Sequence, residues 1–194
     1  MRISKAQAQE NREKVVATAS RLFRAQGIDG VAVGELMKAS GFTHGGFYNH
    51  FASKEALAAE ALDAAFREMD AERERAESLP ALVAAYLSQA ARRTPSRACP
   101  AATLGGEIAR QPDEVKAVFS DGLERIIESL AARQPESADA RGLAIDLFAR
   151  MAGAMILARA LPDHSSLAAE ILETVRDRAL AALPAPTGRG VAPS

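Results

Sequence analysis

The sequence predicts an all-α protein, with a unit of three short helices at the N-terminus and a larger helical domain behind it, about nine helices in all. Apolar residues recur at intervals of three and four along most of the chain, which is the spacing of amphipathic helices. Prolines and capping residues divide these stretches into segments of helical length. No segment shows the apolar–polar alternation that is typical of a half-buried strand.

The first two helices end at glycines. Apolar residues form one stripe over residues 6–26, and Gly27 supplies a C-terminal stop. Residues 33–39 form a second stripe of about two turns, which Ser40 and Gly41 break. The sequence therefore predicts a long helix followed by a short one.

A third helix is expected from residue 43. Thr43 can cap it, and Phe47 and Phe51, four residues apart, would form its buried face. Ser53 is a suitable cap for a fourth, long helix that runs to about Ala76.

The remaining helices are marked mainly by prolines. Pro80, Pro100 and Pro112 stand where a proline at the first helical position starts a helix. The predicted helices lie near 79–93, 99–110 and 112–133, then, after a break at 134–137, at about 138–160 and 165–183. The tail 184–194 is rich in Pro, Gly and Ser, so we expect it to be disordered. The expected domains are 1–54, 55–183 and this tail.

Composition indicates an ordinary globular protein, with 48% hydrophobic and 25% charged residues among 194. The single cysteine excludes an internal disulfide and a multi-cysteine zinc site. The sequence contains no apolar run of about 18 residues and no signal peptide, so we expect a cytoplasmic protein with no membrane association.

The net charge of −1 hides an asymmetry along the chain. Residues 1–54 contain eight basic and four acidic residues, which leaves the front quarter at +4 and the rest acidic. A basic segment is expected in a protein that binds nucleic acid, although solvated basic faces are also common.

Two adjacent glycines, Gly45 and Gly46, stand inside the third predicted helix. Each costs about 1 kcal/mol relative to alanine there, so the pair requires a reason. Two short helices joined by residues 40–42 form a helix-turn-helix pattern, whose second helix enters the DNA major groove. Taken alone, the glycines would fit a loop, but the basic charge and the neighbouring donors favour close approach to DNA. The candidate DNA-contacting residues are Thr43, His44, Gly45, Gly46, Tyr48, Asn49, His50 and Lys54.

The run from Arg12 to Leu57, and especially GVAVGELMKASGFTHGGFYNHFASKEAL, resembles the N-terminal DNA-binding domain of TetR-type transcriptional repressors. The resemblance implies that residues 43–46 read bases, and that Tyr48, His50 and Lys54 contact phosphates. Ala32 and Gly34 depart from the family, which often has a hydroxyl and a long polar residue there. We therefore expect no strong DNA contact from that point.

The same resemblance implies an obligate homodimer built from the last two helices. A stripe at intervals of four, with small residues beside it, would form this interface, although such a stripe also fits an internal core. Its members are Leu143, Leu147, Met151 and Met155, with Gly142, Gly153, Ala154 and Ala158, and on the last helix Leu167, Ile171, Leu172, Val175 and Ala179.

The resemblance further implies a pocket for an unidentified small-molecule effector in the larger domain. Bulky or polarizable residues on the middle helices are candidates to line it, and ordinary core packing is the alternative for each. The candidates are Phe66, Tyr86, Leu104, Ile108, Phe119, Phe148 and Met151.

Cys99 is a further ligand-binding candidate, because it precedes Pro100 at the predicted start of a helix. The helix dipole and Arg92, Arg93 and Arg97 nearby would favour the thiolate and its reactivity. The segment RACPAATLGGEIAR is similar to that of TetR-type regulators with a cysteine here, some of which respond to electrophiles. The alternative is an inert small hydrophobe.

The leading hypothesis is therefore a DNA-binding dimer released from its operator by a ligand or an electrophile. One alternative is an enzyme with Cys99 as nucleophile, which requires His164 to fold back as its base. Another is an architectural DNA binder without ligand control, which would lack a cavity in the middle domain. No cofactor is expected. No metal site is expected either, because His44 and His50 are six residues apart and lie on different helical faces.

Overall fold

The computed structural model describes residues 4–134 and 137–183, which contain helices and no strand. This confirms the all-α prediction. The elements are α1 (Lys5–Gln26), α2 (Val33–Ala39), the 3₁₀ helix η1 (His44–Asn49), α3 (Lys54–Arg75), α4 (Leu79–Tyr86), α5 (Gln89–Arg93), the 3₁₀ helix η2 (Pro95–Arg97), α6 (Pro100–Ile108), α7 (Asp113–Ala131), α8 (Ala140–Arg159) and α9 (Ser166–Ala182). None of the helices in these ranges is both long enough and apolar enough to span a bilayer.

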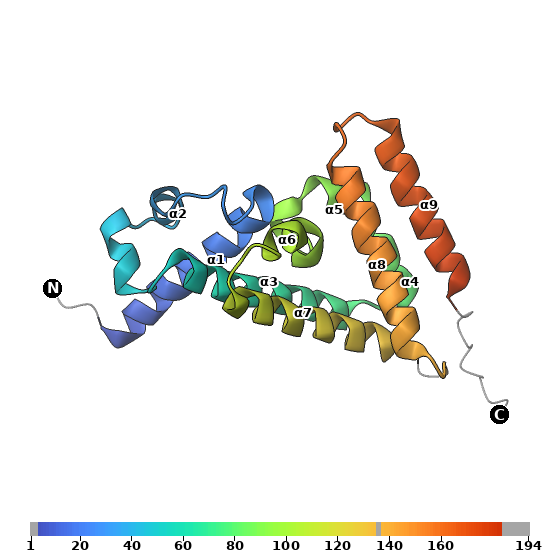
Figure 1. Cartoon of the computed structure of the whole chain (residues 1–194), viewed down its shortest axis with the longest axis horizontal. Coiled ribbons are helices and arrows are strands. Elements are labelled where there is room, and N and C mark those ends of the chain that lie inside the picture. The colour runs from blue at the N-terminus through green and yellow to red at the C-terminus, as the bar shows by residue number, and fades with distance from the viewer. Residues whose placement is uncertain (1–3, 135–136, 184–194) are drawn as a thin grey trace, which may run out of the picture.

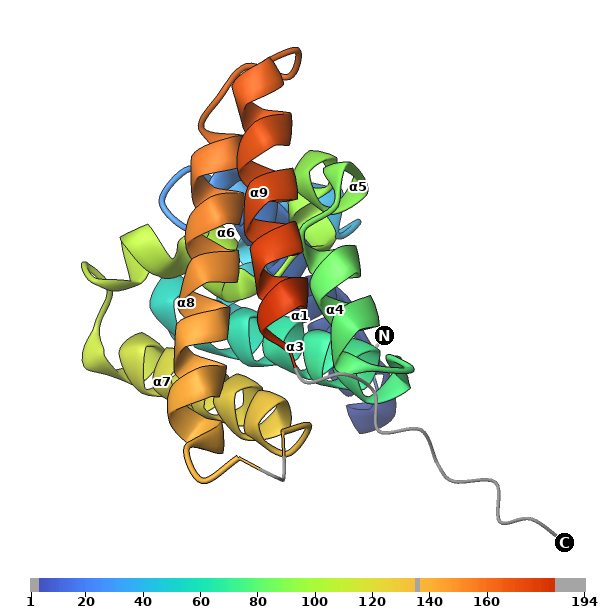
Figure 2. The same cartoon turned by 90° about the vertical axis from the view of Figure 1, so that its right-hand side faces the viewer.

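The helices are arranged along one long axis (Figure 1). The α1–α2–η1 unit forms one end, α3 and α7 run side by side through the middle, and α8 and α9 stand across the opposite end. Figure 2 looks onto that far end and shows α8 and α9 lying next to each other, with no other described helix in front of them. One buried apolar core runs from Val15 on α1 to Ala179 on α9.

Serine side chains begin several of these helices. The Oγ atoms of Ser4, Ser53, Ser78 and Ser88 each accept a hydrogen bond from a backbone N–H in the first turn. At the other end of α1, Gly27 has a φ of +84°, and its N–H donates to the carbonyl of Phe23 at 2.8 Å. Of these residues, Gly27 had predicted the end of the first helix and Ser53 the start of the fourth.

Two of the predicted helices differ from the observed ones. The helix expected at 79–93 is two helices, because Ser88 caps α5 and the chain turns at Leu87. The third helix is a six-residue 3₁₀ helix, in which Thr43 holds the N-cap position without a side-chain hydrogen bond. The break predicted at 134–137 lies partly, and the tail 184–194 wholly, outside the described residues.

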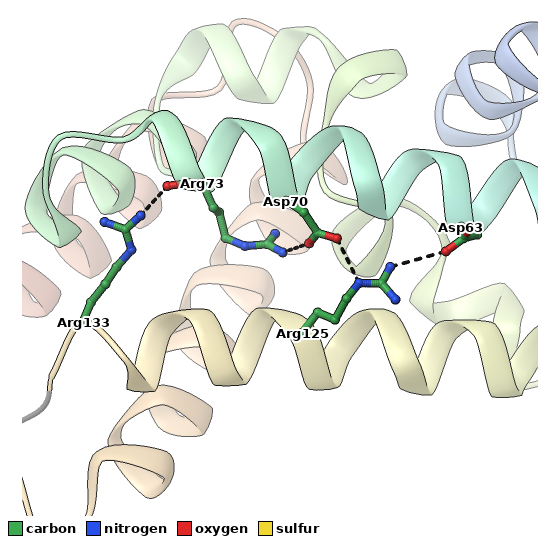
Figure 3. Close-up of polar contacts among 5 residues, drawn as sticks. All are labelled: Asp63, Asp70, Arg73, Arg125 and Arg133. Carbon is green, nitrogen blue, oxygen red and sulfur yellow. Dashed lines mark hydrogen bonds and ion pairs between the residues drawn. The ribbon is translucent and has the colours of Figure 1, made fainter.

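Helices α3 and α7 pack closely because Gly122 has no side chain. A Cβ atom at this position would overlap the ring of Phe66, which is fully buried. Ion pairs flank this contact (Figure 3). Arg125 on α7 bridges Asp70 at 2.9 Å and Asp63 at 3.5 Å, both on α3.

The stripe predicted as the dimer interface is mostly internal. Leu147, Met151 and Met155 on α8 are each at most 3% exposed and belong to the core of this chain. Ala154 and Ala158 are also buried, so the interface assigned to these residues was wrong. The exposed large apolar side chains of the last two helices are Leu143, Ile145, Ile156, Leu157 and Leu167.

Candidate nucleic-acid interface and effector cavity

Helix α2 and η1 are joined by a tight turn that requires a glycine. Gly41 has a φ of +83°, which an L side chain rarely adopts. The N–H of Phe42 donates to the carbonyl of Met37 at 2.8 Å, and the Ser40 hydroxyl donates to that of Leu36 at 2.9 Å. The turn therefore fixes the angle at which η1 leaves α2.

The short helix η1 is anchored by one face and exposes the other. Phe47 and Phe51 are buried, with ring centroids 5.5 Å apart, as the spacing predicted. Tyr48 is 69% exposed and meets Phe47 edge-on. The other exposed candidates are Thr43, His44, Gly45 and Asn49, while Gly46, His50 and Lys54 are half-buried. All eight candidates thus lie together at the end of the molecule remote from α9 (Figure 1).

No contact within residues 4–134 and 137–183 explains the glycine pair. Neither Gly45 nor Gly46 has a positive φ. A Cβ atom on Gly45 would have no atom within 4 Å, and one on Gly46 would make ordinary contacts with Met37 and Thr43. Neither the backbone angles nor the described neighbours therefore require the absence of a side chain at these two positions.

Fewer basic side chains are available at this end than the eight basic residues of 1–54 suggest, because some of them form ion pairs. Arg12 pairs with Glu60, and the buried Arg24 pairs with Glu68 at 2.5 Å, so both are engaged by α3. Lys14 and Lys38 remain exposed near η1. The sequence could not separate these two groups, because the acidic partners lie more than 40 residues away.

A cavity of about 480 Å³ lies among α3, α4, α6, α7 and α8. Four of the predicted lining residues face it: Tyr86, Cys99, Phe148 and Met151. The other four do not line it. Phe66 and Phe119 pack on each other between α3 and α7, with centroids 5.8 Å apart, and Leu104 and Ile108 are buried on α6.

The N-terminal part of the chain matches a known protein family and two curated regulators. The family of "Bacterial regulatory proteins, tetR family" matches residues 15–61. The HTH-type transcriptional regulator AcrR of Shigella flexneri is 42% identical over 59 residues, which are 30% of this chain and 27% of that regulator. LmrA of Bacillus subtilis is 42% identical over 55 residues, 28% of this chain and 29% of its own. The chain therefore spans less than a third of the length of these curated relatives.

Solved structures extend the likeness to about nine-tenths of the chain. A TetR transcriptional regulator from Chloroflexus aurantiacus is 30% identical, with a TM-score of 0.70, covering 90% of this chain and 94% of that one. The chain belongs to the TetR family. The reduced form of NemR from E. coli has a TM-score of 0.76 at 20% identity, covering 92% of this chain and 99% of its own, and supports the fold.

Among the cavity residues of this TetR-family chain that the sequence analysis did not identify are two half-buried arginines. Arg73 and Arg159 line the cavity. Each continues an apolar stripe: Arg73 follows Met69 by four residues on α3, and Arg159 follows Met155 by four on α8. An arginine at a position where the helical period predicts a buried apolar residue is the signal that could have identified them.

The predicted activation of Cys99 is wrong. Burial raises the pKa of the Cys99 thiol, although backbone N–H groups of Ala101 and Ala102, then Tyr86 and Arg73, act in the opposite direction. Arg92, one of the arginines expected to act on the thiol, is buried and donates to carbonyls in the last turn of α8 and just after it. Burial therefore favours the protonated thiol over the thiolate.

Folded Cys99 is expected to react with iodoacetamide at least about tenfold more slowly than the same cysteine in guanidinium chloride at a pH of about 8. Its raised pKa keeps the thiolate fraction low, so the folded-state rate should go on rising above a pH of about 8.5. Mass spectrometry measures this without interference, because the chain has one cysteine. Equal rates in the two states would contradict a buried, protonated thiol.

Proposed function

We propose that the chain is a homodimeric, DNA-binding transcriptional repressor that a small molecule in the cavity releases from its operator. Membership of the TetR family supports regulation through the N-terminal helices. The observation that supports the DNA-binding part is the glycine pair on η1, for which no contact or backbone angle in the described part of the chain gives a reason.

The arrangement around η1 suits a DNA groove. Exposed Gly45 lets the backbone approach base edges, and the hydroxyl of Thr43 and the imidazole of His44 lie beside it. Tyr48 and Lys54 would donate to phosphate oxygens and fix the register, without reading sequence. The first turn of α3, which begins at Lys54, adds backbone N–H groups that favour an anion.

Gly45→Ala is expected to weaken binding to the DNA that flanks this gene by about tenfold or more, because its methyl group would occupy the space of the groove wall. It should not lower the melting temperature, since alanine fits the φ and meets no neighbour. Fluorescence anisotropy and thermal unfolding measure the two effects.

Gly106→Ala is the matched control, because its Cβ atom also meets nothing within 4 Å and it lies on α6. This variant should bind DNA like the unaltered protein. Normal DNA binding by Gly45→Ala would remove the support that the glycine pair gives to the proposal.

Apolar side chains exposed on α8 and α9 support the homodimer. Ile156 and Leu157 are 47% and 59% exposed, and Leu167 on α9 is 50% exposed. Exposed apolar patches mark protein–protein interfaces, and two-fold homodimers are the commonest assemblies. A second copy of this chain, related by a two-fold axis, would cover both helices and present two DNA-binding ends to two half-sites.

Ligand control is supported by contacts of α6 with both functional regions. At its start, Cys99 and Ala102 line the cavity, and the carbonyl of Ala98 accepts from Arg24 of α1 at 3.3 Å. Near its end, the Glu107 carboxylate accepts from the N–H of Ile28 at 2.6 Å, just after α1. A ligand that displaces α6 must change the position of α1, and the coupling is reciprocal with DNA binding.

The alternatives receive less support. An architectural DNA binder would have no use for the cavity. The enzyme hypothesis requires a base at Cys99, but His164 lies exposed between α8 and α9, and the groups that act on the thiol are Tyr86 and Arg73. An electrophile as effector needs a thiolate, which burial disfavours. We therefore propose a non-covalent ligand.

A further inference from the structure

Three buried polar atoms on residues that line the cavity have no hydrogen-bond partner within the described residues. They are Nε of Arg73, Nη1 of Arg159 and the hydroxyl of Tyr86, and this hydroxyl has only the thiol of Cys99, a weak acceptor, beside it. Elsewhere in the described ranges, only the side-chain nitrogen of Gln134 shares this state. Buried polar groups are nearly always hydrogen-bonded, so their concentration at one cavity indicates a missing partner. Because arginine can only donate and tyrosine can donate, that partner is an acceptor.

The two guanidinium groups are held in place by other bonds. Nη2 of Arg159 donates to the carbonyl of Ala91 at 2.9 Å, and its Nε to that of Arg92 at 3.4 Å. Nη2 of Arg73 pairs with Asp70, which is itself held by Arg125 (Figure 3). The free donors are therefore oriented before a ligand arrives, which reduces the entropy lost on binding.

The inner wall of the cavity has an excess of positive charge. No described carboxylate lies within 4.0 Å of Arg159, whereas Arg73 shares Asp70. The acidic lining residues Glu72 and Glu77 are exposed at the rim. Burial lowers the pKa of Arg159, which reflects the cost of keeping this cation out of water. An anion beside it would offset that cost.

The rest of the wall is apolar. Ile126 and Leu130 of α7 and Phe148, Met151 and Met155 of α8 line it. Methionine side chains adapt to ligands of varied shape. The volume of about 480 Å³ lies within the range of about 300–1,000 Å³ that small-molecule sites occupy.

We infer that the effector is an organic acid with an apolar body, whose carboxylate or similar anionic group binds Arg159, Arg73 and Tyr86. This rests on the proposed role of the cavity as the effector site, and it adds the chemical class of the effector. The guanidinium groups supply charge-assisted hydrogen bonds to the head group, and the apolar wall covers the body.

Three probes of equal chain length test the class: decanoate, decan-1-ol and decylamine, titrated below their micellar concentrations into the full chain by isothermal calorimetry. Decanoate is expected to bind at least about tenfold more tightly than the alcohol, and the amine more weakly still. Equal binding of decanoate and the alcohol, tighter binding of the amine, or no binding of any probe would overturn the inference.

Two variants locate the head group. Arg159→Gln and Tyr86→Phe are each expected to lower the preference for decanoate over the alcohol several-fold. Tyr86→Phe keeps the ring that packs against Phe148, so it remains informative if Arg159→Gln does not fold. Arg93→Gln, an exposed arginine that does not line this cavity, is the control and should keep the full preference. An unchanged preference in both variants would overturn the assignment.

The same probes, added to the protein–DNA complex, separate this inference from the proposed function. Decanoate that binds without releasing DNA would leave the anion site standing and refute ligand control. Release of DNA by the alcohol or the amine, with decanoate inactive, would support ligand control and refute the anion site.

Discussion

The double variant Ile156→Glu and Leu157→Glu is expected to be a monomer and to bind operator DNA at least about 100-fold more weakly than the unaltered chain. Both side chains are exposed on α8, on the end of the molecule that Figure 2 faces. In a dimer joined through this helix, two glutamates would be buried without partners, which is strongly unfavourable. A monomer engages one half-site and loses the avidity of two.

The surface involved runs along α8 at helical spacing. Ile145, Ala149, Gly153 and Ile156 are separated by four, four and three residues, so they share one face. None is buried in the single chain, and a Cβ atom at Gly153 would meet nothing within 4 Å. Small residues between larger apolar ones would let a second helix approach closely.

Light scattering after size exclusion measures the mass, and fluorescence anisotropy measures the DNA affinity. The control is Ala117→Glu with Ala132→Glu, which makes the same charge change at exposed positions on and just after α7. The control should remain dimeric and bind DNA normally. A dimeric Ile156→Glu, Leu157→Glu protein would show that the interface lies elsewhere.

Gly122→Ala is expected to lower the free energy of unfolding by about 2–3 kcal/mol, the upper part of the range for overpacked cores. Its Cβ atom would overlap the Phe66 ring, and both residues are buried between α3 and α7. The ring has little room to move, because Phe119 packs against it edge-on, with ring centroids 5.8 Å apart. The two helices must therefore separate, or the ring must leave its rotamer.

Gly106→Ala provides the contrast, because the same substitution in α6 meets nothing within 4 Å. It is expected to stabilise the protein by up to about 1 kcal/mol through its helix propensity. Urea unfolding at one fixed protein concentration measures both variants, since dimer stability depends on concentration. Phe66→Leu combined with Gly122→Ala should recover part of the loss. A Gly122→Ala protein as stable as the unaltered chain would contradict the close packing of α3 on α7.

Much of the helical architecture could be predicted because its signals are local. Ser53 caps α3, Gly27 ends α1, and Phe47 and Phe51 are buried four residues apart, as their spacing indicated. The signal for the break at Leu87 was weak, because an isolated serine inside a helical pattern does not require a new helix. The 3₁₀ geometry of η1 depends on how the turn at Gly41 directs the chain, which periodicity does not report.

Features that depend on distant segments could not be predicted. The sequence shows that α8 has apolar residues on several sides, but whether Leu147 or Ile145 faces solvent depends on where α6 and α9 pack. Likewise, the sequence neighbours of Cys99 suggested an activated thiol, whereas the side chains that act on it, Tyr86 and Arg73, come from α4 and α3. The periodicity of α3 and α8 could have marked Arg73 and Arg159 one by one, but not that the two meet at one cavity, because they lie far apart in the chain.

The contacts of Arg24 restrict how the DNA-binding end of this protein can be exchanged. Its guanidinium is buried, pairs with Glu68 on α3 and donates to the carbonyl of Ala98 before α6. A chimaera that transplanted α1, α2 and η1 onto another regulator would carry a buried cation without its acceptors, which is strongly destabilising. The smallest transferable head therefore includes the acceptors along α3 and at the start of α6, and operator specificity is easier to alter by changing η1 in place.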